Sequence, residues 1–223
     1  MKAVAVAAIC AGAIAPLADG KRSGIAKTAL DGPVAIGPRG IAQDRQADRR
    51  HHGYPAMALH HFPFEHHAWL AGLFDHPGVL GTRGAMGENI STTGLLEDRV
   101  HIGDRFRFGT ALLEVTQPRQ PCATIERHLQ RRGVVKAMVG HARSGWFYRV
   151  LETGHARAGE SLVRIEVGDT EWTVERAFRC VYGPPGGSLQ ELDALVAVAR
   201  ISDRLLLDID KRRARAALVS SHR

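Results

Sequence analysis

Short alternations of apolar and polar residues, separated by glycine-containing turns, run through most of the first 170 residues. Such alternation is typical of half-buried strands. The Gly109-Thr110 step between two alternating runs predicts a hairpin. Strands are predicted within residues 32–37, 99–117, 134–139, 145–152 and 161–167, with Phe106, Phe108, Leu113 and Val115 as core candidates. Many short strands at close spacing favour a curled sheet or barrel.

Helical spacing of apolar residues appears between the strands and dominates after about Thr170. Helices are predicted within residues 64–74, 123–132, 173–182, 188–200 and 202–218. The GPPGG stretch at 183–187 separates the first two helices after Thr170. Ser188, with Glu191 three residues later, has the pattern of a capping box, and Ser202 is a candidate N-cap. We therefore expect a small C-terminal helical bundle.

An apolar run at residues 3–15, preceded by one lysine, has two interpretations. It resembles a secretory signal, because small residues follow where a peptidase would cut. It also suits a buried first strand, because Val4 and Val6 alternate with alanines and Gly12 interrupts the run. The run is too short to cross a membrane as a helix.

The composition is that of an ordinary globular protein, and 223 residues suffice for one large domain or one domain with a small appendage. Lys and Arg number 30 against 23 Asp and Glu, and the excess gathers at residues 45–50, 127–136 and 211–215. This surface favours nucleic acid, a phosphate-bearing cofactor or an anionic small molecule; a solvated basic face without a partner is the equal alternative. The three cysteines are far apart and form no CxxC pair, which indicates reduced thiols and a cytoplasmic location.

Cys122 follows a loop that two prolines stiffen, since Pro118 and Pro121 each fix one backbone angle. Pro121 suits the first position of a helix, which places Cys122 in the first turn of a helix ending near Gly133. There the helix dipole and the neighbouring Arg119 both favour a thiolate. A thiolate suits a nucleophile or a soft-metal ligand, while a cysteine that only packs as a small hydrophobe is the alternative.

The stretch VTQPRQPC at residues 115–122 resembles the signature of the MOSC family, named for the molybdenum cofactor sulfurase C-terminal domain, and of its YiiM-like branch. Other matching segments follow in the family's order: SGIAK (23–27), QDRQAD (43–48), HHGYPAMALHHFP (51–63), GENISTTGLLEDRVHIGDRFRFG (87–109) and SGWFYRVLETG (144–154). The resemblance covers nearly the whole chain. It implies an α+β, mainly β fold: a MOSC-type β-barrel with peripheral helices at residues 1–169 and a three-helix extension at 170–223. It also implies that the chain begins with a strand and not with a signal peptide.

The resemblance also implies a chemistry. In molybdenum-binding members the cysteine of the QPR-PC motif ligates the metal of the molybdenum cofactor (molybdopterin), and the matching residue here is Cys122. The implied activity is reduction of N-hydroxylated compounds, including hydroxylaminopurine-type base analogues, to their amines. The other candidate residues are His52 as proton donor, Lys27 and Arg119 as partners of the pterin phosphate, and Glu88 and Asn89 as residues that orient the site. Their structural alternatives are a surface lysine, a structural arginine and a turn-stabilising pair.

The electron donor is expected to be a separate reductase. The chain has no ferredoxin-like cysteine pattern and no dinucleotide fingerprint, so nothing in the sequence indicates that it takes electrons from NADH unaided. The sequence leaves the physiological substrate and the oligomeric state open.

Four positions depart from the family's pattern. YiiM-like sequences commonly read HGGPDKA or HGGPDRA where this chain has HGYPAMA, so Tyr54 replaces a glycine while Ala56 and Met57 replace an acid and a base. Gln43 replaces the usual glycine before Asp44. If the missing base holds the cofactor, we expect weaker binding or a nearby arginine in its place.

Two other functions compete with the reductase. Cys122 as a persulfide would serve a cofactor-free sulfur carrier, and the basic C-terminal helices would serve a module that binds nucleic acid or protein. The second is disfavoured, because no recognition-helix pattern is visible. Six histidines gather at residues 51–67, but no HExxH and no acid or cysteine at zinc spacing accompanies them, so a zinc site is not expected.

Overall fold

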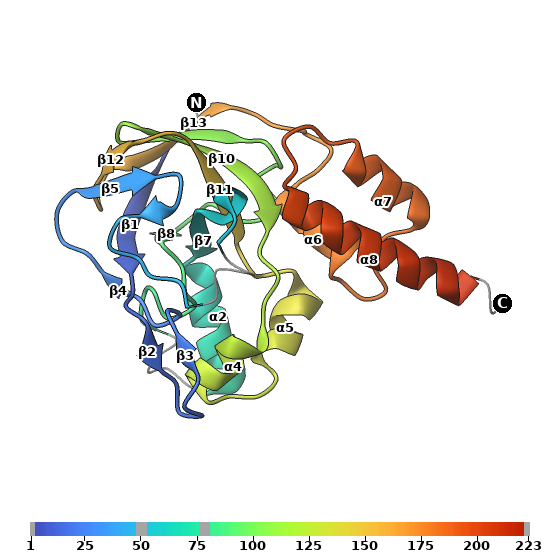
Figure 1. The fold of residues 1–223 in the computed structure, drawn as a ribbon, viewed down its shortest axis with the longest axis horizontal. Coiled ribbons are helices and arrows are strands. Elements are labelled where there is room, and N and C mark those ends of the chain that lie inside the picture. The colour runs from blue at the N-terminus through green and yellow to red at the C-terminus, as the bar shows by residue number, and fades with distance from the viewer. Residues whose placement is uncertain (1–2, 48–52, 76–80, 221–223) are drawn as a thin grey trace.

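The computed structural model describes residues 3–47, 53–75 and 81–220. Within them a closed barrel forms the centre of the molecule (Figure 1). Its strands are β1 (Ala3–Ala11), β7 (Leu59–Pro63), β8 (Ile90–Thr92), β9 (Arg105–Phe108), β10 (Ala111–Pro118), β11 (Trp146–Glu152) and β13 (Ser161–Glu166). The neighbours run in the order β13-β9-β10-β11-β7-β8-β1, and β1 closes the ring by pairing antiparallel with β13. The prediction of an α+β barrel is confirmed.

The hairpin and the first strand are where the sequence pattern predicted them. β9 and β10 pair antiparallel around Gly109-Thr110. Residues 3–11 form β1, a barrel strand, which confirms the strand interpretation of the N-terminal apolar run. Pairs within the barrel are antiparallel except for β7 with β8.

Short strands flank the barrel in two separate small sheets, and one more pairs with β1. β2 (Ala15–Pro16) pairs with β3 (Arg22–Ser23), and β4 (Thr28–Ala29) pairs with β1. β5 (Val34–Gly37) lies between β6 (Gly40–Ile41) and β12 (Gly154–Ala156). A single 3₁₀ turn, η1 (Pro55–Met57), precedes β7.

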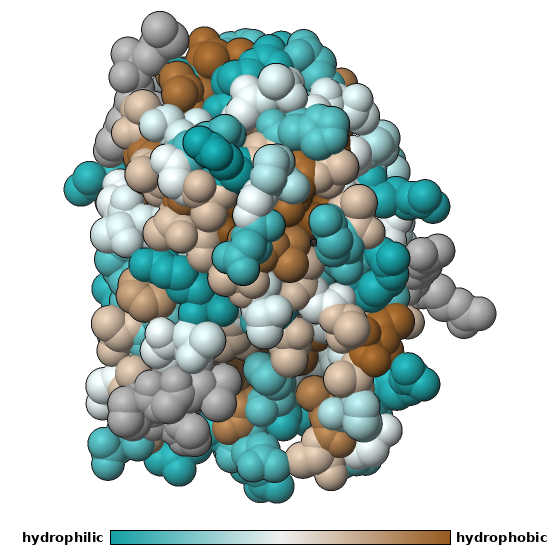
Figure 2. All heavy atoms as spheres, turned by 90° about the vertical axis from the view of Figure 1, so that its left-hand side faces the viewer, coloured by the Kyte–Doolittle hydropathy of each residue, from teal (hydrophilic) through white to brown (hydrophobic). Residues whose placement is uncertain are grey.

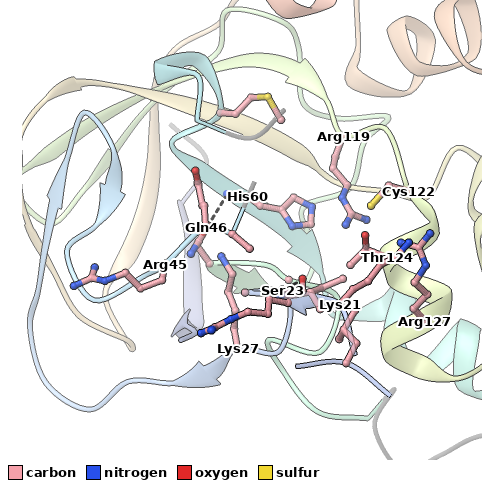
Figure 3. A pocket seen from close by; sticks show the side chains of 18 of the residues that line it. Lys21, Ser23, Lys27, Arg45, Gln46, His60, Arg119, Cys122, Thr124 and Arg127 are labelled. Carbon is pink, nitrogen blue, oxygen red and sulfur yellow. Dashed lines mark hydrogen bonds between the residues drawn. The ribbon is translucent and has the colours of Figure 1, made fainter. Parts of the chain in front are cut away.

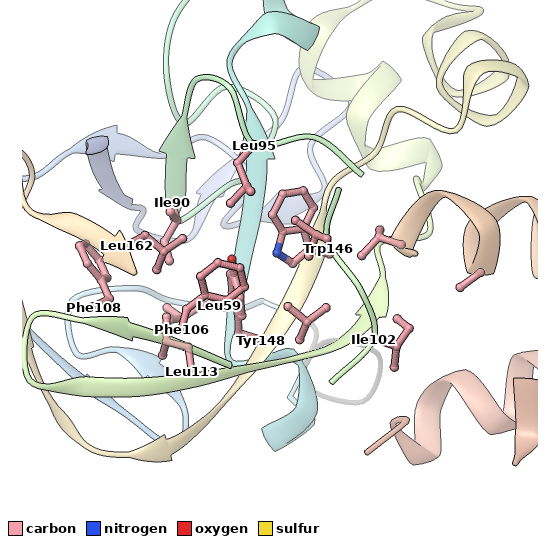
Figure 4. Packing of buried hydrophobic residues seen from close by; sticks show 14 of the residues in the cluster. Leu59, Ile90, Leu95, Ile102, Phe106, Phe108, Leu113, Trp146, Tyr148 and Leu162 are labelled. Carbon is pink, nitrogen blue, oxygen red and sulfur yellow. The ribbon is translucent and has the colours of Figure 1, made fainter. Parts of the chain in front are cut away.

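The barrel interior is filled by side chains (Figure 4). The predicted core residues Phe106, Phe108, Leu113 and Val115 are each at most 1% exposed, so this prediction is confirmed. Trp146 and Tyr148 of β11 alternate into the same interior, as the two-residue period of a strand requires. In Figure 2, the side of the molecule opposite the C-terminal helices shows hydrophilic side chains around smaller apolar areas.

A second hydrophobic cluster lies between three helices below the barrel in Figure 1: α2 (Glu65–Phe74), α4 (Ala123–Leu129) and α5 (Val134–His141). The predicted strand at 134–139 is wrong, because these residues form α5. Its valines favour a strand locally, but Val134 and Met138 stand one helical turn apart and are both fully buried against the other helices. Tertiary packing therefore decides the structure of this segment.

The C-terminal residues form α6 (Val174–Val181), α7 (Leu189–Val196) and α8 (Asp203–Ser220), which confirms the three predicted helices. Ser188 and Glu191 make the predicted capping box, and Ser202 Oγ accepts a hydrogen bond from Leu205 N (2.9 Å). These helices share one continuous hydrophobic core with the barrel. The domain division at residue 169/170 stays a prediction. Among the described residues, no helix is long and apolar enough to cross a membrane.

Candidate functional site

A cavity of about 250 Å³ opens between the short N-terminal strands, the barrel and α4 (Figure 3). Its lining residues include Lys21, Arg22, Ser23, Lys27, Arg45, Gln46, Met57, His60, Asn89, Arg119, Cys122, Thr124, Arg127 and Phe147. The lining contains several cations and no Asp or Glu side chain among the described residues. The cavity is therefore suited to an anionic ligand.

Cys122 lies at this cavity, although not in the helical position predicted. It is the N-cap of α4 with extended backbone angles (φ −122°, ψ 162°), and the first helical residue is Ala123. The helix ends at Leu129, earlier than the predicted end near Gly133, because Gln130 turns into the left-handed region (φ 51°). The sulfur is half-buried and lines the cavity.

The surroundings of Cys122 favour its thiolate. Burial raises the pKa of the thiol, but the Arg119 guanidinium and hydrogen bonds involving Thr124 and Ile125 more than offset burial, so the pKa lies below its ordinary value. Figure 3 shows the guanidinium beside the sulfur. A thiolate is the form that attacks electrophiles and binds soft metals.

Arg119 is only 8% exposed, and its guanidinium is incompletely satisfied. Nη2 makes a long hydrogen bond to the Met86 carbonyl (3.5 Å), while Nη1 has no hydrogen-bond acceptor among the described residues. Burial lowers the pKa of Arg119, and the nearby Cys122 and Glu88 favour its charged form. A buried guanidinium with a free N–H group is prepared to bind an anion in the cavity.

Lys27 and Asn89 also line the cavity, and both donate hydrogen bonds to Asp44. Lys27 Nζ donates to Asp44 Oδ2 (2.6 Å), and Asn89 Nδ2 donates to the same oxygen (2.9 Å). Burial lowers the pKa of Lys27, while Asp44 favours the charged amine. Asn89 also accepts from His60 N (3.0 Å), so it joins the lysine to β7.

Glu88 lies behind the cavity wall and is not among the lining residues. Its fully buried carboxylate accepts from Gly84 N (2.6 Å) and Met86 N (3.0 Å) and pairs with His67 Nε2 (3.0 Å). It thus fixes the turn whose Met86 carbonyl receives Arg119. The structure brings together Cys122, Arg119, Lys27 and Asn89, with Glu88 behind them, while the predicted proton donor His52 lies outside the described residues.

Two residues at the site were not singled out by the sequence. His60 lines the cavity and hydrogen-bonds the Ser144 carbonyl through Nε2 (3.2 Å); burial and the charge of Arg119 hold its pKa well below the usual range, which keeps the ring neutral. Glu97 accepts from Ser144 N (3.0 Å) and Gly145 N (2.7 Å) and contacts His66 Nε2 (2.8 Å). Both residues lie in segments that match the family, His60 at 51–63 and Glu97 at 87–109, but no sequence pattern marked either of them for a role at the site.

The departure at Met57 changes the cavity wall. Met57 lies in η1, is 7% exposed and lines the cavity, so a thioether stands where YiiM-like sequences commonly have a base. The backbone of Ala56 is held by a hydrogen bond from Thr116 Oγ1 (2.6 Å). Exposed cations that line the cavity, Arg45 and Arg127 among them, add positive charge there, although Arg127 also pairs with Asp19 (3.5 Å).

The described histidines of the histidine-rich stretch have separate protein partners. His61 contacts Tyr148 Oη (3.0 Å) and Thr92 Oγ1 (2.8 Å), and His66 contacts Glu97. In the described part of the chain, no group of three or more His, Cys, Asp or Glu side chains is arranged to hold a metal ion.

The basic run of α8 is engaged within the C-terminal helices. Lys211 pairs with Asp208 (3.1 Å), Arg213 pairs with Asp193, and Arg212 donates to the carbonyls of Gly183 and Pro185. These contacts give Lys211, Arg212 and Arg213 partners within the chain, and the expectation that no nucleic acid binds stays a prediction.

Comparisons with known proteins agree with this architecture. A family model described as MOSC domain matches residues 48–170. Protein YiiM of Escherichia coli (strain K12) is 34% identical over 91% of this chain and 89% of YiiM. The crystal structure of YiiM from Geobacillus stearothermophilus superposes with a TM-score of 0.79 and 27% identity, over 94% of this chain and 99% of that one. A protein of Gibberella moniliformis named "Reductase" is 32% identical over 90% of this chain, which corresponds to 36% of the reductase. The chain belongs to the MOSC domain family, in its YiiM-like branch.

Proposed function

We propose that this protein is a molybdenum-cofactor-dependent reductase that converts N-hydroxylated compounds, including hydroxylaminopurine-type bases, to their amines. The observation that carries the proposal is the half-buried Cys122 sulfur beside Arg119, whose Nη1 has no acceptor among the described residues. A relative of matching sequence carries the name reductase, which supports the reaction class.

The residues at the cavity fit the cofactor. A thiolate is a suitable ligand for molybdenum, and the cations around it are suitable partners for the negative charge of a pterin phosphate. Cys122 would ligate the metal. Of the two residues assigned to the phosphate, Lys27 is held on the cavity wall by Asp44, and Arg119 lies next to the sulfur. Exposed Lys21, Arg22, Arg45 and Arg127 at the cavity mouth add further partners for the phosphate.

The cofactor, when bound, supplies the two-electron redox centre, and the chain supplies binding, orientation and protons. Reduction of an N-hydroxyl group to an amine takes up two electrons and two protons and releases water. The electrons come from a separate reductase, and His52 stays the proposed proton donor, while Lys27, held 2.6 Å from Asp44, is assigned to the phosphate. The neutral His60 ring and the Phe147 side chain line the same cavity and add uncharged surface to it.

Molybdenum content tests this proposal. In a host that makes the cofactor, we expect near-stoichiometric metal in the wild type and a large loss in Cys122→Ala, measured by elemental analysis of both purified chains. The matched control is Cys180→Ala, since Cys180 is buried in the C-terminal helices away from the cavity. Loaded wild type should then reduce a hydroxylaminopurine with an artificial electron donor. Equal metal in wild type and Cys122→Ala would refute Cys122 as the ligand.

Metal absent from both chains would refute the molybdenum proposal and point to the cofactor-free sulfur carrier. That function uses the same Cys122 and predicts a persulfide adduct at this residue by mass spectrometry after incubation with a sulfur donor.

A further inference from the structure

Ser202, at the joint between α7 and α8, joins the C-terminal helices to the strand that leads to Cys122. Its hydroxyl accepts from Leu205 N (2.9 Å) as the N-cap of α8 and donates to Gln117 Oε1 of β10. Ser202 is 1% exposed and Gln117 is 2% exposed. A buried hydrogen bond of this kind is costly to lose, because the partner left behind is not hydrated.

The rest of the joint is also held on the barrel. Arg149 Nη2 of β11 donates to the Arg200 carbonyl (3.0 Å), and Arg200 pairs with Glu166 of β13 (2.6 Å). Arg200 itself has a positive φ of 71°, an unfavourable angle for this residue type that the surrounding contacts sustain. The joint is thus a defined structure and not a loose linker.

Gln117 stands close to the functional loop in sequence. Pro118 ends β10, and Arg119 N then donates to the Gly145 carbonyl (3.0 Å). The segment from Pro118 to Cys122 contains Pro118 and Pro121, so two prolines restrict its backbone. A displacement of Gln117 is therefore passed along a stiff segment to the guanidinium and the sulfur.

We propose that Ser202 is a positioning residue: through Gln117 it holds the end of β10, so that the C-terminal helices fix the Cys122 sulfur relative to the Arg119 guanidinium. The importance of this role rests on the proposed function of Cys122. In this role the C-terminal helices position the site residues without contacting a ligand themselves.

Amide hydrogen exchange of the cofactor-free protein tests the proposal by NMR. The reporters are the Arg119 amide, bonded to Gly145, and the Ile125 amide, bonded to the Cys122 carbonyl (3.0 Å). In Ser202→Ala we expect both to exchange about fivefold faster, the effect of losing one hydrogen bond on local opening. Gln117→Ala should do the same, the double variant should add nothing, and Ser202→Thr, which keeps the hydroxyl, should restore the slow rate.

Ser188→Ala is the matched control, because Ser188 caps α7 as Ser202 caps α8, but the hydrogen bonds of its side chain among the described residues are made to Glu191 of α7. General loss of stability would affect the reporters alike in both variants. Unchanged exchange in Ser202→Ala, or equal acceleration in Ser188→Ala, would overturn the proposal. The exchange rates do not depend on molybdenum, so this result is separate from a failure of the proposed function.

Discussion

Arg119→Leu is expected to slow the alkylation of Cys122 at neutral pH by about tenfold or more, because each unit of rise in a thiol pKa removes about nine tenths of the thiolate. Burial alone raises the pKa of this thiol, and the Arg119 charge is the first of the effects that bring it below its ordinary value. Without the guanidinium, burial dominates and the pKa rises. The thiolate that reacts at neutral pH in the wild type should then appear only at higher pH.

The measurement is the rate of iodoacetamide modification of the Cys122 peptide as a function of pH, followed by mass spectrometry in the cofactor-free chain. Arg119→Lys keeps a positive charge and should shift the profile less. Arg127→Leu removes an exposed cation of the same cavity and should leave the profile close to that of the wild type, since solvent screens its charge. A profile unchanged in Arg119→Leu would show that the guanidinium does not set the reactivity of the sulfur.

Much of the barrel was predictable because the local alternation of apolar and polar residues indicates its strands. The β9–β10 hairpin follows from alternation on both sides of Gly109-Thr110, and its inward residues were named from the pattern alone. The closure of β1 on β13 was not predictable in this way, since it joins Ala3 to Val163. The strand predicted at 134–139 failed because burial of Val134 and Met138 in the hydrophobic cluster shared with α2 and α4 outweighs the local preference of valine.

The candidate site shows the same difference between residues close in the sequence, which were predictable, and residues far apart in it, which were not. Cys122 and Arg119 are neighbours in the chain, so their charge relation was visible in the sequence, and the structure places them together. His60 and Glu97 act through the turn at Ser144, which lies 84 and 47 residues away from them. Such contacts leave no local pattern. Glu88 is the opposite case. Its sequence motif predicted a residue that orients the site, but its carboxylate accepts hydrogen bonds from backbone amides behind the cavity wall.

Glu97→Leu is expected to destabilise the protein by about 3–5 kcal/mol, as the loss of one partner of a buried pair does. The Glu97 side chain is 5% exposed and contacts His66 at 2.8 Å. The same carboxylate oxygen Oε1 accepts from Ser144 N and Gly145 N, so leucine would leave two buried amides and an imidazole without their partner. The turn at Ser144 would also lose the contacts that hold it in place. Its Ser144 carbonyl bonds the His60 ring and its Gly145 carbonyl accepts from Arg119 N, so both bonds would be weakened.

The free energy of unfolding in urea, compared between wild type and variants, measures this effect. Glu97→Gln keeps one acceptor oxygen and should cost less than Glu97→Leu. Glu171→Leu is the matched control: its side chain is 81% exposed and pairs with Arg176 at 3.3 Å, so its loss should cost no more than about 1 kcal/mol. If Glu97→Leu proved as mild as Glu171→Leu, Glu97 would not anchor the turn, and the geometry of Arg119 and His60 would have to depend on other contacts.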